Sequence, residues 1–231
     1  MTVVPNDYDS DPGRAGAASG GALAREYPRG DVHPGVAERL ADAGCRLVLD
    51  VGGGTGTLAR LLAERDVEAV VVDQSPAQLS KAPSPKVRAD GSALPFVDRC
   101  VDGVAMLWTL YHFADPVAAI GEARRVLRED GWFVACAPSR WNDPELANYL
   151  PGFGVRTPFD AEQAPELVRS VFANAEVDAW DGLLLTLGDR DDLATFLRMQ
   201  MCPPERIPDA VETLTVPLPL TKRGCLVWAR C

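Results

Sequence analysis

The chain has 231 residues, 47% of them hydrophobic, so it can bury a substantial core without a metal or disulfide staple. Its formal net charge of -10 weakens the case for a nucleic-acid substrate, because an acidic surface repels phosphate backbones. No apolar run is long enough to cross a bilayer, and the segment 1–21 lacks the basic start and apolar block of a secretion signal, which favours a cytoplasmic protein with no membrane partner.

The first 25 residues are rich in Gly, Ala, Asp and Pro and show no apolar period. This composition predicts a mobile N-terminal tail over 1–25 that can fold over a ligand, followed by one domain over 26–231. A helix is expected from Pro34, with Gly44 as its stop. The apolar run Arg46 to Val51 then has the length and lack of alternation typical of a parallel strand covered on both faces.

Predicted helices and strands alternate beyond this first strand. The expected order is a helix over 57–64, a strand over 68–73, a short helix after Ser75-Pro76, strands over 86–88 and 101–107, a helix capped by Asp115-Pro116 and a strand over 132–137. Such alternation indicates right-handed βαβ units. We therefore expect an α/β fold with a doubly wound, mostly parallel, Rossmann-like sheet and helices on both faces.

The regular alternation of predicted strands and helices ends after Ala137. Helices are predicted to open at Asp143-Pro144 and at Ala164-Pro165, and further elements are expected as a strand over 177–187, a helix over 192–201 and a last strand over 225–229. Strands near the end of the chain have no room for a crossover helix between them. This favours an antiparallel strand added at the C-terminal edge of the sheet.

A Gly-rich turn follows the first predicted strand, with Gly52, Gly54 and Gly56 at alternate positions. Residues without a Cβ let a ligand approach the backbone closely, and the helix that follows points free N–H groups toward it. The turn also satisfies the dinucleotide fingerprint G-x-G-x-x-G/A, with Asp73 near the distance of a ribose-binding acid. The turn alone therefore leaves a dinucleotide and another nucleoside cofactor open.

Two further carboxylates favour the second alternative. Asp50 stands directly before the glycines, where it would repel a pyrophosphate but can receive an ammonium group. Asp90 follows in a second turn, and the chain after the sheet is too short for a separate catalytic domain of the usual dehydrogenase kind. In isolation, Asp73 and Asp90 would each be interpreted as a plain loop or turn acid.

Together these motifs resemble the class I S-adenosylmethionine-dependent methyltransferases, clearly over 27–137 and loosely beyond. The resemblance implies S-adenosylmethionine as the cofactor, with its methionine part at the Gly-rich turn, its ribose at the end of the second strand and its adenine at the turn around Asp90. The cofactor-binding residues that it implies are Asp50, Gly52, Gly53, Gly54, Gly56, Asp73, Gln74, Asp90, Gly91 and the backbone near Leu107.

Candidates for chemistry lie just after the strand expected beneath the cofactor. His112 is a candidate general base and Tyr111 a second candidate, although a capping or packing role is the more common one for residues in such positions. Six cysteines occur without a CxxC pair or a His-rich partner set. They are interpreted as reduced thiols of a cytosolic protein, and no metal site is expected.

The sequence thus predicts an enzyme that moves the methyl group of S-adenosylmethionine to O, N or C of a small organic acceptor, and a secondary-metabolite acceptor fits the length and acidic charge. The alternatives are methylation of RNA or protein, a NAD-dependent oxidoreductase, and a cofactor-binding module without catalysis. The expected partners are a small-molecule acceptor and no nucleic acid or membrane, and either a monomer or a homodimer is compatible with the sequence.

Overall fold

The structure, a computed structural model, describes residue 9 and residues 31–231. The expected tail therefore lies outside the described residues, apart from Asp9, as do the first five residues of the expected domain. The strands are β1 (Leu47–Val51), β2 (Glu68–Asp73), β3 (Lys86–Arg88), β4 (Val101–Leu107), β5 (Leu127–Pro138), β6 (Ala175–Leu187) and β7 (Leu218–Arg230). The helices are α2 (Val32–Asp42), α3 (Thr57–Ala63), α4 (Pro76–Lys81), α5 (Pro116–Val126), α6 (Ala164–Val171), α7 (Arg190–Met199) and α8 (Ile207–Thr213), with short 3-10 turns η2 (Leu110–His112), η3 (Pro144–Leu146) and η4 (Pro204–Arg206).

The strands form one seven-stranded sheet in the order β3-β2-β1-β4-β5-β7-β6. Pairing is parallel from β3 through β5, whereas β7 pairs antiparallel with both β5 and β6. The predicted doubly wound sheet with an antiparallel C-terminal addition is confirmed. Because the order reverses beside β1, the carboxyl ends of β1, β2 and β4 face a common crevice, which is where such sheets bind ligands.

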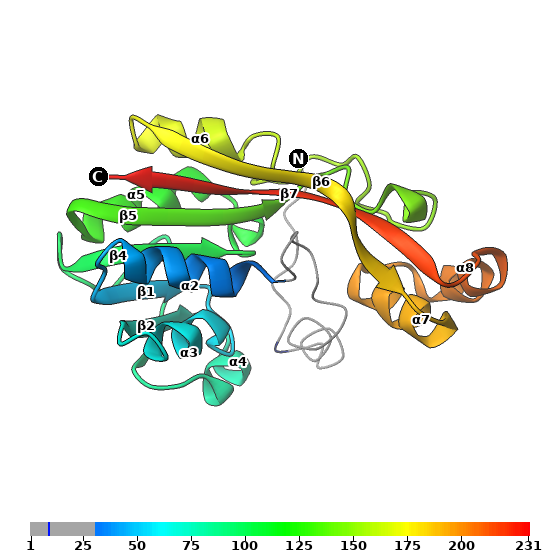
Figure 1. Ribbon diagram of the computed structural model, residues 1–231, viewed down its shortest axis with the longest axis horizontal. Helices are drawn as coiled ribbons and strands as arrows, with labels where there is room; N and C mark the ends of the chain where they lie inside the picture. The colour runs from blue at the N-terminus through cyan, green and yellow to red at the C-terminus, as the bar shows by residue number, and fades with distance from the viewer. Residues whose placement is uncertain (1–8, 10–30) are drawn as a thin grey trace.

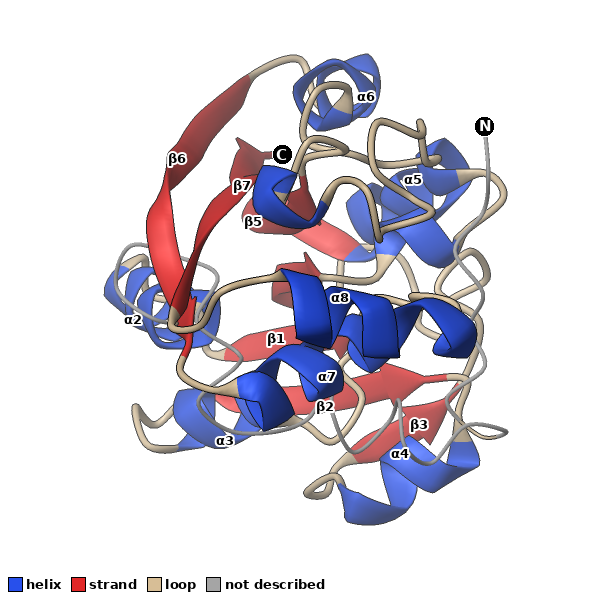
Figure 2. Ribbon diagram, turned by 90° about the vertical axis from the view of Figure 1, so that its right-hand side faces the viewer, coloured by secondary structure: helices blue, strands red, loops and turns tan. Residues whose placement is uncertain are grey.

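Helices cover both faces of this sheet. Figure 2 shows α2 and α3 on one side and α5 on the other. Buried side chains such as Leu40 and Leu62 join α2 and α3 to the strands, and Ile120 and Phe172 do the same for the opposite face. Strands buried on both sides explain the continuous apolar runs of the sequence.

A third cluster of buried residues lies at the outer end of the β6–β7 pair. It includes Leu187, Phe196, Ile207 and Leu220 and joins the strand ends to α7 and α8. Figure 1 shows α7 and α8 past the end of the sheet, on the side toward which β5 points. We call this extension, residues 181–223, the arm. The sequence analysis predicted α7 but neither α8 nor the length of β7.

Several boundaries differ from the prediction for local reasons. Helix α2 begins before Pro34 because the Asp31 side chain accepts the His33 N–H at 3.1 Å and caps the helix. Strand β5 begins at Leu127, before the predicted start at Trp132, and includes Asp130, which adopts a φ of 64°. The helix expected after Asp143 is a single 3-10 turn, η3.

A buried ion pair fastens the arm to the segment after β5. Lys222 on β7 donates to both carboxylate oxygens of Asp143, at 2.8 and 3.0 Å, and its Nζ lies 5.0 Å from the centroid of the Phe196 ring on α7. The side chains of Lys222 and Asp143 are 1% and 2% exposed. Because neither charge can be solvated, each depends on the other.

Removing one partner of this pair is therefore expected to be costly. Lys222→Ala should lower the free energy of unfolding by about 3–5 kcal/mol, because Asp143 would remain buried without its counter-charge. Urea denaturation measures this change. Glu129→Ala is the control, because it removes an exposed pair with Arg99 and should cost less than about 1 kcal/mol. Equal losses from both variants would contradict the assigned role of the pair.

Candidate functional site

The Gly-rich turn joins the end of β1 to the start of α3. Gly52, Gly54 and Gly56 have φ values of 70°, 54° and 77°, in the left-handed region that glycine adopts without strain. The Gly52 N–H donates to the Val72 carbonyl at 2.7 Å, which ties the turn to β2. The turn is therefore a fixed bend at the carboxyl edge of the sheet.

Most of these glycines make room for protein atoms. A Cβ at Gly52 would overlap the Thr109 side chain, one at Gly53 would overlap Asp50, and one at Gly56 would lie 2.5 Å from Cδ of Pro83. Gly54 differs, because among the described residues a Cβ there would meet only Oε1 of Gln78, at 3.7 Å. The expectation that the glycines admit a ligand is thus narrowed to Gly54.

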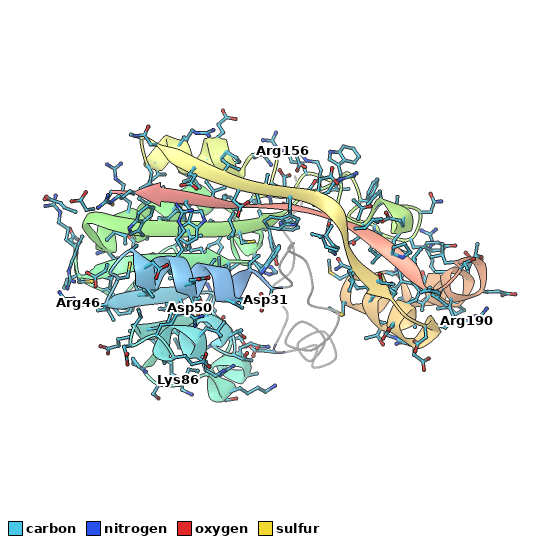
Figure 3. All side chains as sticks on the ribbon, viewed as in Figure 1. Asp31, Arg46, Asp50, Lys86, Arg156 and Arg190 are labelled. Atoms are coloured by element: carbon cyan, nitrogen blue, oxygen red, sulfur yellow. The ribbon has the colours of Figure 1, made fainter. Side chains whose placement is uncertain are left out.

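Asp50 lies on β1 directly beside this turn. It is 3% exposed, and none of the described residues gives its Oδ2 atom a hydrogen bond. Burial raises the pKa of this carboxyl group to about 6, while nearby His33, the Ala59 amide and Arg60 act in the opposite direction. Figure 3 labels Asp50 on β1 and Asp31, which pairs with His33 at 2.5 Å. A buried oxygen without a partner fits an ammonium ligand.

Asp73 ends β2 and faces the turn from the neighbouring strand. Its Oδ2 accepts the Gly54 N–H at 2.9 Å, and its Oδ1 accepts the Ser75 N–H at 2.8 Å. Each carboxylate oxygen keeps a second lone pair for a ligand. Asp73 therefore has a structural role, which the sequence analysis missed, beside the predicted ribose contact.

The predicted adenine turn is brought to the same edge. A Cβ at Gly91 would lie 2.9 Å from Val51 at the end of β1 and equally close to Phe113. Asp90 is exposed, and its Oδ1 accepts from the backbone and hydroxyl of Ser92 at 2.8 and 2.7 Å. Asp90 thus stabilises a local turn, as expected of a turn-forming acid. Its Oδ2 atom takes no part in the two hydrogen bonds with Ser92.

The remaining cofactor candidates lie beside these residues. Gln74 is exposed between Asp73 and Ser75, and its carbonyl accepts from the Arg88 guanidinium at 3.0 Å. The Leu107 side chain is only 6% exposed, in keeping with a core role. The contact expected near Leu107 therefore rests on the backbone.

The two candidates for chemistry lie on η2, one turn beyond the end of β4. Tyr111 and His112 are half-buried, and their ring centroids are 4.6 Å apart. The His112 N–H donates to the Thr109 carbonyl at 3.0 Å, and Thr109 itself packs on Gly52. Contact between Thr109 and the Gly-rich turn thus fixes both rings relative to that turn.

Three residues near the Gly-rich turn were not predicted from the sequence as part of the site. Thr109 was not singled out, and Gln78 was passed over although it stands three residues after the helix cap Ser75. Asp9 accepts from the Ser75 hydroxyl at 2.5 Å and from the Ala77 N–H at 3.2 Å. Only the Ser-x-x-Gln spacing of Ser75 and Gln78 carried a signal, since it matches a capping box.

Comparison with known proteins agrees with this geometry. A family model described as a methyltransferase domain matches residues 49–135, from β1 to β5. An uncharacterized methyltransferase of Mycobacterium bovis is 37% identical over 118 residues, which make up 48% of this chain and 48% of that protein. A demethylmenaquinone methyltransferase of a Mycobacterium species is 36% identical over 132 residues, 56% of this chain and 55% of that protein. The chain spans about half the length of the curated relatives it matches.

A solved structure extends the likeness to the whole fold. The crystal structure of a SAM-dependent methyltransferase from Archaeoglobus fulgidus has a TM-score of 0.57 and 21% identity, over 90% of this chain and 98% of that one. No helix in the described part of the chain is both long and apolar enough to span a bilayer. The open face of Gly54 beside Asp73 thus lies in the part of the chain, β1 to β5, that is similar to a methyltransferase domain.

Proposed function

We propose that this protein transfers the methyl group of S-adenosylmethionine to a small organic acceptor. The proposal rests on the open face of Gly54 between the carboxylates of Asp50 and Asp73. Asp50 suits the ammonium group of the methionine part, and Asp73 suits the ribose hydroxyls. A dinucleotide would bring its pyrophosphate to the Gly-rich turn beside Asp50, and the repulsion by this carboxylate disfavours a nicotinamide cofactor.

The cofactor supplies an activated methyl group, so the protein's task is to hold donor and acceptor in line and exclude water. In this role Asp50, Gly54 and Asp73 bind the donor, and Thr109 holds η2 against the turn. His112 then stands on the ligand side of the sheet, where it serves as the candidate acceptor of a proton from the substrate.

A small-molecule acceptor is supported by two observations. The net charge of -10 disfavours RNA, and one relative is named for the small molecule demethylmenaquinone. The six free cysteines suit a reducing cytosol. A role in secondary metabolism, and either a monomer or a homodimer, stay predictions of the sequence.

Isothermal titration with S-adenosylhomocysteine and, separately, with NAD tests the choice of cofactor. Binding of the former alone supports the proposal, whereas binding of NAD alone would overturn it. Turnover of labelled S-adenosylmethionine with a panel of small acceptors, RNA and protein then separates the acceptor classes. Binding without turnover on any of them would favour a module that lacks catalysis.

Substitutions of Gly54 and Gly52 by alanine are expected to have different effects, one on ligand affinity and one on stability, although both glycines have a positive φ. Gly54→Ala should weaken S-adenosylhomocysteine binding about tenfold or more, because the new Cβ occupies the ligand face, while the fold survives. Gly52→Ala should instead lower the melting temperature, because its Cβ overlaps Thr109. Titration calorimetry and thermal melts measure both effects. Normal affinity in Gly54→Ala would mean that the ligand lies elsewhere.

The raised pKa of Asp50 predicts that the free energy of unfolding depends on pH. The residue is expected to lower stability at neutral pH while it favours cofactor binding. Between about pH 4 and 6 the folded chain keeps a proton that the unfolded chain releases, so this group's contribution to the free energy of unfolding falls as pH rises. Without ligand, Asp50→Asn should therefore exceed wild type by on the order of 1–3 kcal/mol at pH 7, and by nearly nothing at pH 4. Urea denaturation at the two pH values measures the difference.

The same substitution should weaken cofactor binding, because an amide cannot pair with the ammonium group. Calorimetry with S-adenosylhomocysteine at pH 7 provides this second measurement. An Asp50→Asn protein that is less stable than wild type at pH 7, or that binds as tightly, would contradict the assignment.

His112 is tested by separating turnover from binding. His112→Ala should lower turnover at least about 100-fold, since a positioned base contributes that much, and should leave S-adenosylhomocysteine affinity unchanged. Tyr111→Phe is the matched variant, because it removes only the neighbouring hydroxyl. Full activity of His112→Ala with the acceptor found by the panel would remove His112 from the mechanism.

A further inference from the structure

The side chain of Gln78 borders the open face of Gly54. Gln78 lies on α4 and is 8% exposed, and its Oε1 atom is the nearest described atom to that face, 3.7 Å from where a Cβ of Gly54 would lie. Its backbone N–H donates to the Ser75 hydroxyl at 3.1 Å, but the described residues give its carboxamide no hydrogen bond. The carboxamide therefore keeps its capacity to donate and accept hydrogen bonds for a ligand at this face.

The sequence predicts a hydrogen-bond partner for the Gln78 side chain, but in the structure that partner bonds to another residue. In a Ser-x-x-Gln capping box, the glutamine side chain reaches back to the N–H of the serine. Here the Ser75 N–H donates to Oδ1 of Asp73 instead, at 2.8 Å. Asp73 therefore takes the capping role that Gln78 would have, and both side chains lie next to Gly54: Asp73 accepts its N–H, and Gln78 borders its open face.

We propose that Gln78 is a ribose-positioning residue that acts together with Asp73. A ribose hydroxyl can donate one hydrogen bond and accept another. The Asp73 carboxylate can only accept, whereas the amide of Gln78 can donate to the hydroxyl oxygen. Since a half-turn of the carboxamide exchanges its donor and acceptor ends, the N–H₂ group can face the ligand from the place where Oε1 now lies.

This inference rests on the proposed function and deepens it. Gln78→Met keeps the length and packing of the side chain but removes its polar end. We expect it to weaken S-adenosylhomocysteine binding about three- to tenfold, the net effect of losing one neutral hydrogen bond. The melting temperature without ligand should stay equal, because the carboxamide makes no hydrogen bond to the described residues. A merely structural role would lower it.

Two controls isolate the hydroxyl contact. Gln200→Met makes the same change on the half-exposed residue after α7 and should leave affinity unchanged. A 2′,3′-dideoxy analogue of S-adenosylhomocysteine lacks both hydroxyls, so wild type and Gln78→Met should bind it equally.

The outcomes separate this inference from the function on which it rests. If wild type does not bind S-adenosylhomocysteine, the proposed cofactor is wrong. If wild type binds, Asp73→Asn weakens binding and Gln78→Met does not, the role of Gln78 alone is overturned. An equal loss by Gln78→Met for the dideoxy analogue would also overturn it, because the lost contact would not involve the ribose.

Discussion

The site is organised by one carboxylate that spans two neighbouring loops. Asp73 accepts the Gly54 N–H from the loop after β1 and the Ser75 N–H at the start of α4. These charge-assisted bonds fix the open glycine face relative to the end of β2. The placement of Gln78 follows from them, since it loses its capping partner to the same carboxylate. Asp73 thus shapes the crevice before any ligand contact.

Asp50 shows a different balance between stability and binding. Its Oδ2 atom is buried and has no hydrogen-bond partner within residues 31–231, and burial raises the pKa of the carboxyl group to about 6. An apolar or neutral side chain would suit the empty fold better, so the residue is explained by a cationic ligand more readily than by packing. Strained or unsatisfied groups of this kind concentrate at functional sites.

The arm lies on the side of the sheet toward which β5 points, and it has its own buried cluster. Its attachment through Lys222 and Asp143 joins β7 to the segment that follows β5. A buried ion pair has strict geometry, so it specifies one arrangement of these segments even where its net contribution to stability is small. The geometry of the Gly-rich turn and the attachment of the arm therefore depend on separate interactions, the hydrogen bonds of Asp73 and the Lys222–Asp143 ion pair.

The sequence by itself determined the alternation of strands and helices, the antiparallel C-terminal edge and the motif positions, because periodicity and turn residues act over short distances. It predicted that Gly54, Asp50 and Asp73 lie near one another, and the structure places them at the carboxyl ends of β1 and β2, since parallel strands end at the same edge. Only the tertiary structure decided which glycines serve packing, as with Gly52 against Thr109, and which partner Ser75 chooses. The length of β7 and the helix α8 were also settled there. Such contacts join residues far apart along the chain, so short-range sequence patterns cannot predict them.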